Sequence, residues 1–71
     1  MILNGAKIKS LRQKASLSQF DLSYEINMNR ELISKLENGR RANTSLETAY
    51  KLAKYFNVTI EELITTDPPP H

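Results

Sequence analysis

The 71-residue chain contains no cysteine and no tryptophan, and its single histidine, His71, follows three prolines at the end of the sequence. Without thiols, neither a disulfide nor a thiolate metal site can form. A histidine in this position is poorly placed to serve as the base of a hydrolytic triad. The nearest carboxylate pair, Glu61 and Glu62, consists of neighbours that point to different sides of a helix. We therefore expect no enzyme activity, no metal site and no cofactor.

Glycine and long apolar runs are also scarce. The two glycines, Gly5 and Gly39, fall at the ends of expected helices, so the sequence has no glycine-rich phosphate-binding loop. No apolar run approaches the roughly 18 residues that a membrane span requires. The first ten residues lack the apolar stretch and cleavage site of a signal peptide. We expect a cytoplasmic protein that does not bind membranes.

The charged residues are unevenly distributed, although the net charge is only +2. Residues 1–41 carry eight basic and four acidic side chains, whereas residues 42–71 carry two basic and four acidic ones. A basic first half is compatible with a surface that faces nucleic acid, and an ordinary solvated surface explains it equally well. Charge alone therefore does not decide the function.

Apolar spacing and capping residues predict five short helices and no strand. The predicted helices cover about 5–15, 18–26, 30–38, 45–56 and 59–64. We expect one compact all-α domain over residues 1–66, followed by a disordered proline-rich tail, DPPPH, at 67–71.

The helix expected over 45–56 has the clearest apolar stripe. Its predicted inward-facing residues are Leu46, Ala49, Leu52, Ala53 and Phe56. Thr44 and Glu47 match the capping box that marks a helix start, and Thr59 and Glu62 repeat this signature before the last helix.

The segment from Ser18 to Glu37 predicts two short helices joined by a three-residue turn. Asn27 tolerates the left-handed backbone that ends a helix, and Asn29 can cap the helix that follows. Ile33 and Leu36 form the inward pair of this second helix. Two short helices joined in this way present the second one to the major groove of DNA.

Residues 18–39, SQFDLSYEINMNRELISKLENG, resemble the lambdoid repressor and Cro-like, Xre-type helix-turn-helix pattern S-Q-x-x-L-A-x-x-x-G-V-S-x-x-x-I-S-x-x-E-N-G. The resemblance extends from about Ile8 to Ile64. It implies a compact five-helix lambda-repressor-like domain with the helix-turn-helix at its second and third helices. It also implies sequence-specific binding of double-stranded DNA by a transcriptional regulator, with repression favoured. Departures from this pattern include Asn27 for the turn glycine, Ser23 for alanine and Asn29 for the serine cap.

The resemblance also implies roles for individual residues. Those expected to contact DNA bases are Arg30, Glu31, Leu32, Ser34 and Lys35, with core packing as the alternative for Leu32. Those expected to contact phosphates are Ser18, Gln19, Asn38, Arg40 and Arg41. Arg12 and Glu37 match a structural pair that ties the first helix to the third. The expected dimer contact consists of Tyr55, Asn57, Val58, Thr59 and Ile60.

One recognition helix contacts only a few base pairs, so useful specificity requires two half-sites and a homodimer on a near-palindromic operator. The alternative is a protein-interaction module of the antitoxin or regulator-adaptor type with the same fold. A large apolar patch away from the third helix would favour that alternative, and a regulatory protein partner remains open in either case.

Overall fold

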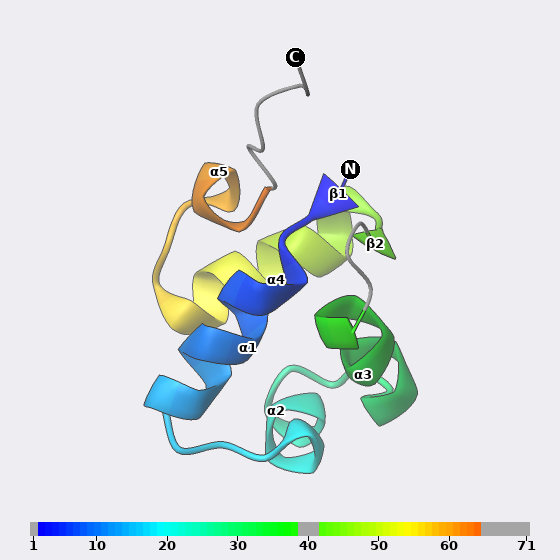
Figure 1. Cartoon of the computed structure of the whole chain (residues 1–71), viewed down its shortest axis with the longest axis vertical. Helices are drawn as coiled ribbons and strands as arrows, with labels where there is room; N and C mark the ends of the chain where they lie inside the picture. The colour runs from blue at the N-terminus through cyan, green and yellow to red at the C-terminus, as the bar shows by residue number, and fades with distance from the viewer. Residues whose placement is uncertain (1, 39–41, 65–71) are drawn as a thin grey trace.

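The computed structural model describes residues 2–38 and 42–64. Five helices and two very short strands occupy these ranges (Figure 1). In chain order they are β1 Ile2–Leu3, α1 Gly5–Lys14, α2 Gln19–Glu25, α3 Arg30–Asn38, β2 Ala42–Asn43, α4 Leu46–Phe56 and α5 Ile60–Leu63. The predicted compact five-helix architecture is confirmed, with two short strands added to it. The proline-rich tail expected at 67–71 lies outside the described residues.

Each helix contributes at least one fully buried apolar side chain to a single core. Together with Leu3 of β1, the largest fully buried side chains are Ile8, Leu22, Ile33, Leu36, Leu52 and Leu63. Burying one side chain of this size stabilises the fold by roughly 1.5–3 kcal/mol. Figure 1 shows that α2 and α3 lie together at the end of the molecule opposite α5. The core therefore packs against one side of the α2–α3 pair, and the other side of the pair is not covered by it.

Side-chain caps begin the helices. Asn4 Oδ1 accepts a hydrogen bond from the Lys7 backbone N–H, and Ser18 and Thr59 each form a complete capping box. The prediction that Thr44 caps the fourth helix was wrong. Ser45 takes this position, and its Oγ accepts from the Thr48 N–H at 3.2 Å. Both Thr44 and Ser45 are residue types that cap helices, but only Thr44 is followed three positions later by a glutamate, so the pattern indicated the wrong one.

The expectation of no strand was also wrong. β1 and β2 pair antiparallel, with Ile2 opposite Asn43 and Leu3 opposite Ala42. Leu3 also forms an isolated bridge with Ile64, and the Asn4 N–H donates to the Leu63 carbonyl at 2.7 Å. Strands of two residues are too short to show an alternating pattern, so no sequence signal could have indicated them.

Leu46 departs from the predicted core face because its side chain is 60% exposed. The four other predicted residues of this stripe are buried or half-buried. Helical periodicity identifies a shared face but does not show whether a neighbouring element covers its end. Leu46 is the first residue of α4, and the core leaves it largely uncovered.

Candidate nucleic-acid interface

The connection between α2 and α3 is a tight turn stabilised by backbone hydrogen bonds. Asn27 has the left-handed backbone that the sequence predicts, with φ 53°. The Met28 N–H donates to the Ser23 carbonyl at 2.8 Å. Asn29 Oδ1 then accepts from the Glu31 N–H at 2.8 Å, which begins α3 as predicted. The two helices are thereby fixed at a definite angle to each other.

The two sides of α3 differ in burial. Ile33, Leu36 and Glu37 are buried against the rest of the domain. The side chains that face solvent are Arg30, Glu31, Lys35 and Asn38, with Ser34 half-buried and Leu32 37% exposed. The residues predicted to contact bases thus come together on one helix, with Leu32 at the edge of the exposed face. This face is rich in hydrogen-bonding groups, the kind that can pair with base edges and phosphates.

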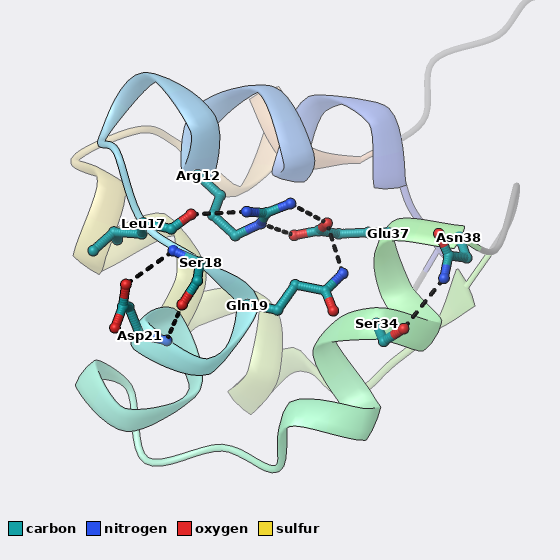
Figure 2. Close-up of polar contacts among 8 residues, drawn as sticks. All are labelled: Arg12, Leu17, Ser18, Gln19, Asp21, Ser34, Glu37 and Asn38. Atoms are coloured by element: carbon teal, nitrogen blue, oxygen red, sulfur yellow. Dashed lines mark hydrogen bonds and ion pairs between the residues drawn. The ribbon is translucent and has the colours of Figure 1, made fainter.

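Behind this face, a polar network links α1, α2 and α3 (Figure 2). Arg12 Nε donates to Glu37 Oε2 at 2.6 Å, and Nη2 donates to Oε1 at 2.9 Å. Arg12 Nη1 also donates to the Leu17 carbonyl at 2.7 Å. The hydrogen bond to Glu37 raises the pKa of Arg12 above its already high ordinary value, so the guanidinium stays charged.

Gln19 joins this network through a contact that was not predicted from the sequence. Its Nε2 donates to Glu37 Oε1 at 3.1 Å. The resemblance implies a phosphate contact for Gln19, and the structure shows that one amide hydrogen is already directed inward. No local sequence pattern could have indicated this pair, because the two residues are 18 positions apart on different helices.

Three of the five predicted phosphate-contacting residues lie within the described part of the chain, Ser18 and Gln19 at the start of α2 and Asn38 at the end of α3. Ser18 begins α2, where its Oγ accepts from the Asp21 N–H at 2.9 Å and its own N–H donates to Asp21 Oδ2 at 3.0 Å. Hydrogen bonding to the Asp21 carboxylate, first from the Ser18 backbone N–H and then from the Ser18 side chain, lowers the pKa of Asp21. Asn38 ends α3, and its Nδ2 donates to Ser34 Oγ at 3.2 Å. Arg40 and Arg41 lie outside the described residues.

The five residues predicted for the dimer contact form the corner between α4 and α5. Tyr55 is 39% exposed, and its ring meets the Phe56 ring edge-on at a centroid distance of 5.2 Å. Asn57 caps the end of α4 in the left-handed conformation, and Thr59 caps the start of α5. Val58 and Ile60 are partly buried against the core. Several of these residues therefore stabilise the corner within the single chain.

Two aromatic side chains on α2 are more exposed than is usual for their type. Phe20 is 63% exposed and Tyr24 is 79% exposed, and both line a shallow hollow beside Leu17. They are four positions apart and so share one side of the helix. The sequence pattern alone does not distinguish this exposed side of α2 from a packed one.

Comparisons with known proteins agree with this geometry. The profile of the helix-turn-helix family matches residues 8–63. An uncharacterized HTH-type transcriptional regulator of Archaeoglobus fulgidus is 39% identical over 61 residues, which cover 86% of this chain and 84% of the relative. Control protein C.MunI of Mycoplasma sp is 37% identical over 62 residues, covering 86% and 82% of the two chains.

A solved structure has the same fold. The crystal structure of the restriction-modification controller protein C.AhdI from Aeromonas hydrophila superposes with a TM-score of 0.74 at 30% identity, covering 84% of this chain and 89% of that one. Within the described residues, no helix has the length and apolar character needed to cross a membrane. From the family match over residues 8–63, the protein belongs to the Xre-type helix-turn-helix family of DNA-binding transcriptional regulators, which is not a family of enzymes.

Proposed function

We propose that the protein binds a near-palindromic operator as a homodimer, with α3 of each copy in the major groove. The observation that carries the proposal is the polar outer face of α3, whose opposite side is fixed to α1 by the buried Arg12–Glu37 pair. A rigid helix can hold its side chains in register with base edges. Two copies on half-sites about 34 Å apart would give the specificity that one helix lacks.

The side chains on the outer face of α3 suit several features of base edges. Arg30 and Lys35 can donate to guanine O6 and N7, and Glu31 can accept from cytosine N4. Leu32, at the edge of the exposed face, can contact a thymine methyl group. Ser34 can hydrogen bond to a base or a phosphate. These residues would determine the sequence that the protein selects.

The phosphate contacts are proposed to come from both ends of this surface. Ser18 and Gln19 at the start of α2, and Asn38 at the end of α3, carry neutral donors. Arg40 and Arg41 follow α3 in the sequence and would add positive charge. With Lys35, they give about six cationic contacts per dimer, and hence a slope of log affinity against log salt of roughly −5.

The dimer contact is proposed at the α4–α5 corner, through Tyr55 and residues 57–60. Support comes from the exposed edge of Tyr55 and from Val58 and Ile60, which are only partly buried in the single chain. A second copy would cover this remaining apolar surface. Replacing Tyr55 by alanine should weaken dimerisation in sedimentation experiments, whereas the same change at Tyr50, which lies outside the proposed contact, should not.

Selection of bound duplexes from a random pool tests the proposal directly. Wild type should enrich a palindrome, and Arg30→Ala should lose definition at one position in each half-site. Lys54→Ala, which removes an exposed cation from α4, is the matched control and should select the wild-type sequence. Enrichment of a single, non-repeated site would contradict the dimer, and failure to enrich any sequence would contradict operator recognition.

A second candidate function is protein interaction by the same fold, in the manner of an antitoxin or regulator adaptor. The specific observation that favours it is the exposed aromatic side of α2, with Phe20 63% and Tyr24 79% exposed. Such side chains often mark protein contacts. A Phe20→Ser/Tyr24→Ser variant should keep its affinity for DNA and lose any regulatory partner that the wild type captures. Unchanged capture of that partner would count against this candidate.

A further inference from the structure

The exposed face of α3 carries a hydrogen-bonded pair of side chains near its end. Asn38 Nδ2 donates to Ser34 Oγ at 3.2 Å, and the two residues are one helical turn apart (Figure 2). A serine hydroxyl has one proton to donate and two lone pairs to accept with. In this pair the amide of Asn38 occupies a lone pair of Ser34, so the proton of Ser34 is not used by Asn38.

A second serine in the helix-turn-helix shows the opposite arrangement. Ser23 Oγ donates to the Phe20 carbonyl at 2.6 Å, so its proton is used within its own helix. This is the ordinary behaviour of a serine in the middle of a helix. Ser34 makes no such bond within the part of the chain that the structure describes. Since no described residue takes this hydroxyl proton, Ser34 can donate it to a partner outside the protein.

We propose that Asn38 sets the polarity of Ser34, so that Ser34 meets DNA as a hydrogen-bond donor. The partner is then an acceptor atom: guanine O6 or N7, adenine N7, thymine O4 or a phosphate oxygen. The N4 amino group of cytosine, itself a donor, is disfavoured. This inference rests on the proposed placement of α3 in the major groove. It adds which atoms of DNA Ser34 can contact.

The competing arrangement is a Ser34 proton donated to the Asn38 Oδ1 atom, which would leave Ser34 as an acceptor. Asn38→Asp enforces that arrangement, because a carboxylate can only accept from the hydroxyl. The substitution also adds a negative charge, so its effect is compared in two backgrounds, wild type and Ser34→Ala. The added charge is the same in both backgrounds. A difference between the two effects of Asn38→Asp on DNA affinity therefore reports whether the Ser34 hydroxyl acts as donor or acceptor.

The experiment measures dissociation constants at one salt concentration, for the selected operator and for an unrelated duplex of equal length. We expect Ser34→Ala to bind about three- to tenfold more weakly than wild type, the effect of one lost hydrogen bond. Asn38→Asp should weaken binding more in the wild-type background than in the Ser34→Ala background, by a similar factor. Ser10→Ala, which removes a partly exposed serine from α1, is the matched control. Thermal melting checks that every variant is folded.

The two duplexes identify the source of the acceptor. A loss on the operator alone, with one base position relaxed on reselection, supports a base edge, whereas an equal loss on both duplexes supports a phosphate. Unchanged binding by Ser34→Ala, or equal effects of Asn38→Asp in the two backgrounds, would overturn the inference while the operator itself remains bound. If wild type selected no operator, the proposed function would fail, and this inference with it.

Discussion

Arg12 and Glu37 meet through two parallel hydrogen bonds, of 2.6 and 2.9 Å, although they are 25 positions apart in the sequence. The Glu37 side chain is fully buried and that of Arg12 is 11% exposed. With Gln19 as a third donor, the carboxylate is well satisfied in an environment that otherwise disfavours charge. The pair therefore fixes the orientation of α3 relative to α1.

Removing one partner of this pair should destabilise the fold strongly. In Arg12→Ala, the Glu37 carboxylate would stay buried without its opposite charge, which we expect to lower the free energy of unfolding by about 3 kcal/mol. Urea denaturation followed by circular dichroism measures this. The double variant Arg12→Met/Glu37→Leu removes both charges and should be less destabilised than the single variant. A single variant within about 0.5 kcal/mol of wild type would show that the pair contributes little.

The capping box of α2 predicts a dependence of stability on pH. Hydrogen bonds from Ser18 lower the pKa of Asp21 in the folded protein. The ionised carboxylate therefore stabilises the fold at neutral pH, and this contribution is lost as the pH falls from about 4 through the lowered pKa. The free energy of unfolding of Asp21→Asn should lie below that of wild type at pH 7, and the two values should converge at low pH. A gap that stays constant from pH 7 to pH 3 would contradict this assignment.

Within the described residues, three residues other than glycine adopt positive φ, and they should respond differently to replacement by glycine. Ser16 has φ 59°, and Asn27 and Asn57 have φ 53° and 56°. Asparagine tolerates this conformation better than serine does. We expect Ser16→Gly to raise the free energy of unfolding by about 0.5 kcal/mol, and Asn27→Gly to change it less, with Asn27→Ala lowering it by about 1 kcal/mol. Thermal unfolding of the three variants tests the order, and a destabilised Ser16→Gly would contradict it.

The sequence predicted those features whose signals are local. The caps at Ser18, Asn29 and Thr59 and the left-handed Asn27 each depend on a few neighbouring residues, which is why the helix-turn-helix could be placed nearly to the residue. The resemblance supplied the pairing of Arg12 with Glu37, which spacing alone could not have indicated.

What the sequence missed depends on contacts between distant segments. The pairing of β1 with β2 involves only two residues on each strand, too few for a periodic signal. Leu46 shares the apolar face of α4, but its exposure depends on which elements reach the end of that helix. The link from Gln19 to Glu37 requires the packed positions of α2 and α3. Each of these is a property of the assembled domain and not of any one segment.

The salt dependence of binding should report the charge that α3 brings to DNA. Lys35 is exposed on this face, and a dimer would place two copies of it against the duplex. Each cation that neutralises a phosphate contributes about 0.9 to the slope of log affinity against log salt. Lys35→Ala should therefore reduce the slope by about 2, from roughly −5 toward roughly −3.

The slope can be measured by fluorescence anisotropy of a labelled operator at salt concentrations from about 50 to about 200 mM. The control Lys54→Ala removes a cation that lies over the Tyr50 ring on α4, and it should leave the slope unchanged. An unchanged slope for Lys35→Ala would remove Lys35 from the proposed phosphate contacts. If binding to the operator alone were then weaker, Lys35 would keep only the guanine contact proposed above.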